Sequence, residues 1–242
     1  MMELNEIQQK TYEFLVKVYG DRTKGHEEDI KSIIVITSNL ISEMYKNGDI
    51  GNFITKEYTA SCLQNVRILY DIFEIIKPSE KIIEDEKSVY FILIMYCHQC
   101  EALSFLFKNF ISKNAKAVYL KLDDVEKWLK NNKRKTVRPS DIAEILNRIE
   151  KNKDTTTLQD FISVFNNKYP KYSKQLFKGR FIPELRNAVS HNRLKMDKDE
   201  KTITFYINSK PQTLTFIDIV SLYDTLMMIY FAIVIELTQP RG

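Results

Sequence analysis

The sequence predicts a mainly α fold, a helical bundle with a small β-hairpin inserted before the last helix. Only six glycines and six prolines interrupt its 242 residues, so turns are few and the elements between them are long. Hydrophobic residues make up 44% of the chain, which is enough for a sizeable core and excludes a disordered or fibrous protein. Apolar residues recur at helical spacing through most of the chain, and in only one region do they alternate with polar residues.

Helical periodicity extends from the N-terminus to about residue 192. Pro78 ends one predicted helix, and Pro139 opens another, as proline commonly does in a first turn. The stretch before residue 192 is one helix or two, with Gly179 and Pro183 near the join, where Pro183 fits best as a first-turn residue. The predicted helices cover residues 3–19, 26–47, 55–76, 84–112, 115–131, 139–151, 157–166 and 172–192.

The period of the apolar residues changes after Arg193. Polar and apolar residues alternate over 201–207 (KTITFYI) and briefly over 213–216, and residues 208–212 between them contain Pro211. This pattern predicts a small β-hairpin. A mostly apolar helix over 217–237 follows, with its polar residues on one stripe.

Two apolar segments raise the question of a membrane. Residues 89–107 and 216–237 are long and apolar, but polar or charged residues interrupt each of them, so buried helices are favoured over membrane spans. The N-terminus has no signal pattern, and the three cysteines are an odd number. A reduced, cytoplasmic protein without a membrane partner is therefore expected.

Two of the cysteines form the stretch Cys97-His-Gln-Cys100, which suggests a zinc site. Such a site needs four ligands, usually from a second pair at suitable spacing, and Cys62 is the one other cysteine. Because Cys97 and Cys100 lie in an apolar helical pattern, two small buried side chains are favoured. We expect neither a bound metal nor another cofactor.

Positive charge is concentrated in the middle of a chain whose net charge is +4. Residues 108–180 contain 18 Lys and Arg against 8 Asp and Glu, which leaves the remainder negative. Such a stretch is typical of a surface that binds a polyanion, and equally of a solvated helical face. The cations predicted to contact RNA are Lys130, Lys133 and Arg134 in the densest basic segment, and Lys178, Arg180 and Arg193 near the motif described next.

One stretch, FIPELRNAVSHNRL over residues 181–194, combines an arginine and a histidine in an amphipathic helical pattern. On a helical wheel, Asn187 and His191 are four residues apart and share one side. Arg186 lies between that side and the apolar one. The polar residues are therefore expected to face solvent or a partner, while the core face is formed by Ile182, Leu185, Ala188 and Val189.

These residue types suit the cleavage of RNA by its own 2′-hydroxyl group. Histidine gives or takes a proton at neutral pH, and arginine holds a phosphate through a charged two-pronged hydrogen bond. The reaction needs a base, an acid and positive charge on the phosphate, so one histidine per chain is too few for both proton roles. Two chains that meet on this outward face through a two-fold interface supply two histidines and two arginines.

The motif formed by Arg186, Asn187 and His191 resembles the R-x(4–6)-H motif of the HEPN superfamily, which usually has Asn, Asp or His directly after the arginine. The resemblance implies a helical bundle and a homodimer with a metal-independent endoribonuclease site at its seam, in which these three residues are catalytic. It also implies a toxin–antitoxin, abortive-infection or CRISPR-linked defence system, with an antitoxin or sensor as a further partner. A subgroup paired with nucleotidyltransferases has a tyrosine two positions after the histidine; this chain has Arg193 there, so that subgroup's modification is not expected.

The resemblance divides the chain into an N-terminal helical region, residues 1–83, with no assigned role, and a HEPN-like domain, residues 84–242. Two other functions stay open. One is an inactive HEPN-like module that binds RNA or a partner protein, and the other is a helical adaptor with no nucleic-acid role. Tyr169, Tyr172 and Lys174 either guide an RNA strand towards the motif or coat the helix before it.

Overall fold

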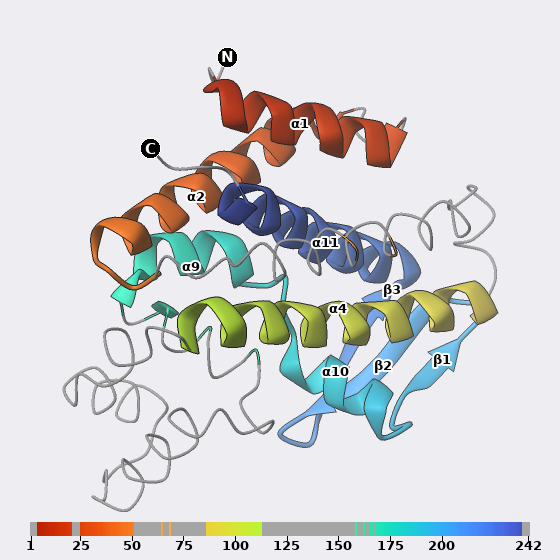
Figure 1. The fold of residues 1–242 in the computed structure, drawn as a ribbon. Helices are drawn as coiled ribbons and strands as arrows, with labels where there is room; N and C mark the ends of the chain where they lie inside the picture. The colour runs from red at the N-terminus through yellow and green to blue at the C-terminus, as the bar shows by residue number, and fades with distance from the viewer. Residues whose placement is uncertain are drawn as a thin grey trace, which may run out of the picture.

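A central apolar helix organises the fold. The computed structural model describes residues 4–20, 25–50, 86–112 and 168–238, together with residues 64, 68, 158, 162, 165 and 166. Helix α11 (Phe216–Thr238) is buried along most of its length and lies between α2 (Glu27–Lys46) and α4 (Glu86–Ser112) (Figure 1). The predicted mainly α fold is confirmed, and so are the predicted helices that correspond to these three.

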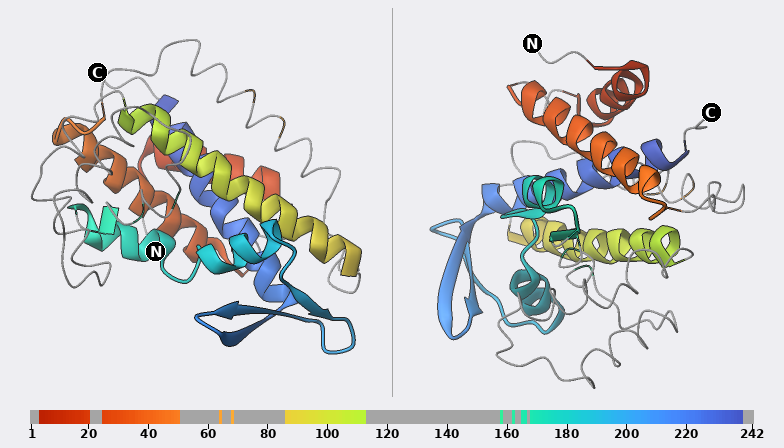
Figure 2. Two further views of the ribbon diagram at one scale, coloured as in Figure 1. Left: turned by 90° about the horizontal axis from the view of Figure 1, so that it is seen from below. Right: turned by 90° about the vertical axis from the view of Figure 1, so that its left-hand side faces the viewer.

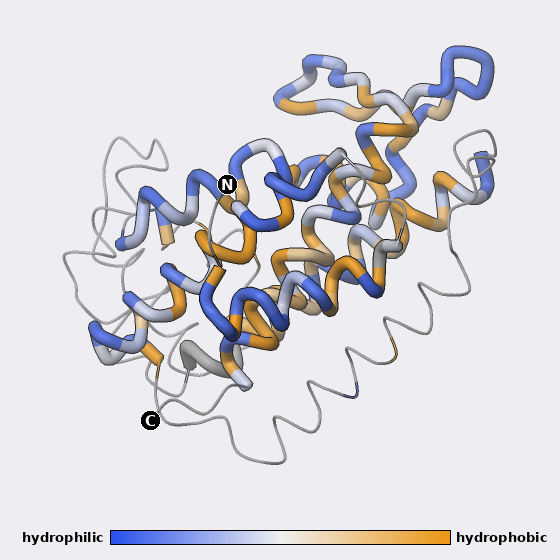
Figure 3. The backbone as a smooth tube through the Cα atoms, turned by 90° about the horizontal axis from the view of Figure 1, so that it is seen from above, coloured by the Kyte–Doolittle hydropathy of each residue, from blue (hydrophilic) through white to orange (hydrophobic). Residues whose placement is uncertain are grey.

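Helix α1 (Glu6–Tyr19) packs on α2 and α11 on the side of the bundle away from α4 (Figure 2). A capping box fixes its start: the Asn5 side chain accepts the Gln8 N–H at 2.9 Å, and the Gln8 side chain accepts the Asn5 N–H at 3.0 Å. Hydrophilic and hydrophobic residues alternate around the turns of the outer helices (Figure 3), as expected for helices with one face in the core.

The stretch before residue 192 forms two helices, α9 (Pro170–Phe177) and α10 (Pro183–Ser190). Gly179 lies between them with φ of +76°, a left-handed conformation that glycine adopts without a Cβ penalty. Pro183 stands in the first turn of α10, where the missing N–H of proline costs nothing. The predicted join at these two residues is thus confirmed.

A three-stranded antiparallel sheet of order β1-β2-β3 follows, formed by β1 (Lys195–Asp197), β2 (Thr202–Ile207) and β3 (Lys210–Thr215). Ile203 and Phe205 of β2 are buried on the face towards α10. The predicted hairpin corresponds to β2 and β3, and β1 is an additional strand.

The turn of the hairpin is shorter than predicted. Ile207 pairs with Lys210, so only Asn208 and Ser209 connect the strands, with φ of 49° and 65°. Two consecutive positive φ values are typical of the tight turn that matches strand twist, and asparagine tolerates them. Pro211 therefore belongs to β3 rather than to a loop, which is possible because β3 is an edge strand.

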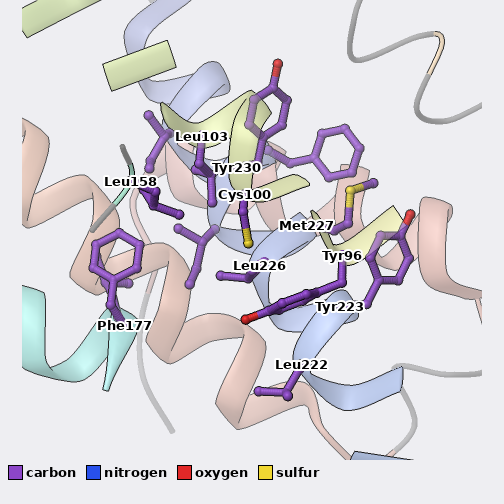
Figure 4. Close-up of a cluster of buried hydrophobic side chains, with 14 of the residues drawn as sticks. Tyr96, Cys100, Leu103, Leu158, Phe177, Leu222, Tyr223, Leu226, Met227 and Tyr230 are labelled. Carbon is purple, nitrogen blue, oxygen red and sulfur yellow. The ribbon is translucent and has the colours of Figure 1, made fainter. Parts of the chain in front are cut away.

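The core between α4 and α11 is shown in Figure 4. Tyr96 and Cys100 of α4 lie among side chains of α11, and Phe177 of α9 closes one end. Residues of α1 and α2 belong to the same hydrophobic core. The division of the chain at residue 83 stays a prediction, and the predicted helices over 55–76, 115–131 and 139–151, with most of 157–166, lie outside the described residues.

Two helices pass a length and composition test for membrane spans among the described residues, Glu86–Phe107 and Phe216–Thr238. Their most apolar windows are 56% and 67% buried inside the fold. Core helices of water-soluble proteins pass the same test, so these helices are weak evidence for a membrane protein.

Candidate active site around Arg186 and His191

Helix α10 is held against α4 by its start and by its core face. The N–H of Ile182, directly before the helix, donates to the Tyr96 hydroxyl of α4 at 2.9 Å. Ile182 itself is half-buried. The core face predicted from the helical wheel is confirmed by three buried residues of α10, Leu185, Ala188 and Val189.

The helix ends before the motif does. α10 ends at Ser190, and His191 is the capping residue beyond it, whereas the sequence predicted a helix to residue 192. Asn192 adopts the left-handed conformation with φ of 51°, and the N–H of Arg193 reaches back to the Ala188 carbonyl at 2.7 Å. This is the Schellman arrangement, which ends a helix by turning the chain away from its axis. His191 is therefore presented at the exposed end of the helix.

Arg186 is the best-anchored polar residue of the motif. Its Nη2 forms an ion pair with Glu101 of α4, and its Nη1 donates to the Asn187 side-chain oxygen at 3.1 Å. The arginine side chain is 32% exposed and that of Glu101 58%, so the pair lies at the surface, with the guanidinium the more covered. Both terminal nitrogens are thus engaged within a single chain, so an incoming phosphate competes with Glu101 for the guanidinium.

Asn187 and His191 are exposed, as the helical wheel predicts. Asn187 was expected to orient His191 or the substrate, and the structure instead brings its side chain to Arg186. In the described part of the chain, the His191 imidazole has no hydrogen bond or ion pair. A histidine in this setting is accessible to solvent and to a ligand, and nothing in the described fold sequesters its ring nitrogens.

The half-buried Cys97 lies beneath the motif. Its thiol donates to the Arg186 carbonyl at 3.7 Å. Burial raises the pKa of Cys97 to about 11, with the nearby Arg186 guanidinium opposing the shift. Burial also raises the pKa of Cys100, which is 2% exposed. Both thiols stay protonated at neutral pH, which is unlike a cysteine nucleophile.

No group of three or more His, Cys, Asp or Glu side chains is placed to hold a metal ion among the described residues. Among the described residues, the groups near α10 that can move a proton or stabilise charge include Arg186, His191 and their amide and carboxylate neighbours. General acid–base catalysis with charge stabilisation needs only such groups.

The other cations predicted to contact RNA differ in how exposed they are. Arg193 is exposed next to His191, and Lys178 is exposed at the end of α9. The Arg180 guanidinium donates to the Gln175 carbonyl at 2.8 Å, and burial lowers its pKa. Arg180 is thus turned towards α9. Lys130, Lys133 and Arg134 lie outside the described residues, as does the rest of the densest basic segment.

The aromatic residues before the motif have a packing role. Tyr169 is 2% exposed, and its hydroxyl donates to the buried Asp49 at the end of α2. Tyr172 is half-buried, and a hydrogen bond with Glu43 raises its pKa. The alternative in which Tyr169 guides an RNA strand is therefore wrong, because its ring lies in the core.

Two residues near the motif were not among the predicted site residues. Glu101 holds Arg186, and His98 is exposed on α4 one turn before Glu101. The ion pair itself joins residues 85 positions apart, so no local pattern indicates it.

Comparison of the chain with protein-family models, with characterised proteins and with solved structures finds no match. A function for this protein therefore has to be argued from the residues and from their geometry.

Proposed function

We propose that this protein is a metal-independent endoribonuclease of the HEPN type, with Arg186, Asn187 and His191 as its catalytic residues. The observation that carries the proposal is the arrangement at the exposed end of α10. There a half-covered guanidinium is fixed by Glu101 and Asn187, and an accessible imidazole follows five residues later. A fixed cation and an accessible acid–base group within one motif suit phosphodiester cleavage.

Each residue has a role in the proposed reaction. A histidine removes the proton from the 2′-hydroxyl, whose oxygen attacks the neighbouring phosphorus, while an acid protonates the departing 5′-oxygen. Arg186 stabilises the negative charge that develops on the phosphate, and Asn187 keeps the guanidinium in place. The products are a 2′,3′-cyclic phosphate and a 5′-hydroxyl end.

The proposed enzyme acts as a homodimer. One His191 supplies either the base or the acid, so a second copy has to supply the other. Asn187 and His191 are exposed on one end of α10, where a two-fold axis brings the same patch of two chains together. The proposed setting is a cytoplasmic toxin or defence system, with RNA as substrate and an antitoxin or sensor as a further partner.

A second candidate is a HEPN-like module that binds RNA or a partner protein without cleaving it. The ion pair with Glu101 favours the form of this module that binds a partner protein, because a carboxylate on the guanidinium competes with the phosphate of RNA. The two functions differ in whether bound RNA is cut.

The test is to incubate the purified chain with tRNA or total RNA in EDTA and to map the new ends. Cleavage that leaves 2′,3′-cyclic phosphates and is lost in Arg186→Ala and His191→Ala supports the endoribonuclease. Lys17→Ala and His26→Ala are matched controls, since both residues are exposed on other helices or their ends, and they should retain cleavage. RNA binding without cleavage supports the second candidate. A chain that neither binds nor cleaves RNA supports the helical adaptor.

A further inference from the structure

An exposed stripe runs along α4 beside the candidate site. Three large hydrophobic residues on it are unusually accessible: Phe91 is 42%, Ile94 45% and Phe105 57% exposed. Phe105 also has a contact within the chain and keeps this exposure nevertheless. His98 and Glu101 are exposed between them, which completes the α4 stripe as Phe91, Ile94, His98, Glu101 and Phe105.

The spacing of the α4 stripe is that of a helix that packs against another helix. Its members follow one another at alternating intervals of three and four residues, which keeps them on one seam of the helix. From Phe91 to Phe105 the seam is about 21 Å long. The opposite side of α4 packs on α11, and α10 lies beside its middle (Figure 1), so the described helices leave this side outermost.

The polar residues at the centre of the stripe, His98 and Glu101, indicate which kind of partner the stripe can bind. A lipid surface in contact with Phe91 and Phe105 would also cover His98 and the charged Glu101, which is costly in an apolar medium. A protein helix with apolar residues opposite the ends and a polar pair opposite the centre meets no such cost. The stripe itself has that composition, so a second copy of the chain is its best-matched partner.

We infer that α4 packs antiparallel against α4 of a second copy of this chain, with Ile94 facing Phe105 and His98 facing Glu101 across the two-fold axis. In an antiparallel pair, the stripe residues of one helix face those of the other only in certain registers. These are the registers in which the alternating intervals of three and four residues coincide when the two helices are followed in opposite directions. One such register pairs residues whose numbers sum to 199, which sets Ile94 against Phe105 and His98 against Glu101 and leaves Phe91 without a facing member of the stripe. A shift of one heptad towards the N-terminus places Ile94 against His98 and Phe91 against Glu101, and a shift the other way places Glu101 against Phe105, so both neighbouring registers set polar residues against apolar ones.

This register completes the proposed site, and in that respect it rests on the proposed function. Glu101 holds Arg186 in its own chain, so His98 of the second copy comes to lie beside the Glu101–Arg186 pair. Each site then contains Arg186, Asn187 and His191 of one chain and His98 of the other. The two-fold axis passes between residues 98 and 101, so the two motifs lie close to one another on either side of it.

Paired cysteines test the register in the full-length chain. Ile94→Cys combined with Phe105→Cys should form a covalent dimer under mild oxidation, whereas either substitution alone should not. Phe91→Cys combined with Phe105→Cys is the matched control: it places the same number of cysteines on the same seam, at positions that do not face each other in this register. All variants carry Cys62→Ser, and this background, in which Cys97 and Cys100 are half-buried and buried, should give no covalent dimer.

Sedimentation adds a test that needs no new cysteine. His98→Glu sets a carboxylate against Glu101 of the second copy and should raise the dimer dissociation constant about tenfold or more, while His98→Gln should leave it nearly unchanged. A native chain that is monomeric at about 50 μM overturns the inference, and so does cross-linking by the control pair. If residues 94 and 105 cross-link but the native chain does not cleave RNA, the proposed endoribonuclease is refuted and the interface stands. If the native chain cleaves RNA as a dimer but residues 94 and 105 do not cross-link, the interface is refuted and the endoribonuclease stands.

Discussion

Glu101 of α4 and Arg186 of α10 form an ion pair across 85 residues of sequence. The pair joins the helix that carries the motif to the longest helix described at the surface of the bundle. It fixes the guanidinium, and it also places a negative charge where the phosphate of a substrate would bind. Substrate binding by Arg186 therefore involves competition with Glu101, and the strength of that competition is measurable.

Glu101→Gln should strengthen RNA binding. The glutamine oxygen still accepts a hydrogen bond from Arg186, but the charge that competes with phosphate is gone. Because the Glu101 side chain is 58% exposed, the gain is small, about threefold in affinity, with a slightly steeper salt dependence. Fluorescence anisotropy with a labelled RNA, in a His191→Ala background to prevent cleavage, measures both quantities.

Glu86→Gln is the control for this substitution, because it removes the same charge from the exposed start of the same helix. It should leave affinity within the experimental error. An RNA affinity that falls in Glu101→Gln and not in Glu86→Gln would show that Glu101 supports binding rather than competing with it.

Arg186→Lys should separate binding from cleavage. Lysine keeps the positive charge, but it lacks the planar fork that engages Glu101 and Asn187 together. We expect RNA affinity within about threefold of the native chain and single-turnover cleavage slower by about 100-fold. Equal cleavage rates for lysine and arginine at this position would mean that the fork geometry has no part in catalysis.

The left-handed conformation of Asn192 at the end of α10 predicts different effects for two substitutions of this residue. Asn192 adopts φ of 51°, which glycine accepts freely and alanine does not. Asn192→Ala should destabilise the fold by about 1 kcal/mol and slow cleavage by displacing His191, while Asn192→Gly should retain both. Urea denaturation and cleavage assays on the two variants check this, and indistinguishable midpoints would contradict the strained turn.

Much of the helical fold could be predicted because its signals are long. The apolar faces of α2 and α11 repeat over five turns or more, and a capping pair marks the start of α1. β1 offers no comparable signal, since it has three residues and is defined by its pairing with β2. The hairpin turn was placed too widely because Pro211 suggests a loop, although proline is compatible with the edge strand in which it lies.

The candidate site was predictable in part. The residues of α10 that face the core follow from helical periodicity, and so does the exposure of Asn187 and His191. The position of His191 beyond the helix end did not follow, because Asn192 is a weaker stop signal than glycine. Glu101 could not be found from sequence, since its role depends on how α4 and α10 pack.

The pKa of Cys97 predicts how this thiol reacts. Burial raises it to about 11, so the folded protein favours the thiol and disfavours the thiolate. Alkylation by iodoacetamide should be about 100-fold slower than for a free cysteine at pH 8 and should rise about tenfold for each pH unit up to pH 10. Peptide mass spectrometry resolves the label at Cys97. A rate that levels off below pH 9 would show that the thiol ionises far more easily than its surroundings imply.

A buried polar cluster at the end of α2 predicts the largest loss of stability. The Asp49 side chain is 1% exposed, and its carboxylate accepts from the Lys168 ammonium at 2.6 Å and from the Tyr169 hydroxyl. The same hydroxyl accepts from the Asn47 amide at 3.2 Å, so the cluster joins the end of α2 to the residues that lead into α9.

Asp49→Asn removes one charge of this cluster and leaves the Lys168 ammonium largely buried without its counter-ion. Breaking such a pair typically costs about 3 kcal/mol, which in a chain of this length lowers the melting temperature by about 6–12 °C. Glu6→Gln removes the equivalent charge from an exposed i,i+4 pair with Lys10 and should leave the melting temperature unchanged. Calorimetry measures the melting temperature of both variants. If the Asp49 cluster holds α2 to α9, Asp49→Asn lowers the melting temperature much more than Glu6→Gln does, and equal melting temperatures for the two variants would contradict this role.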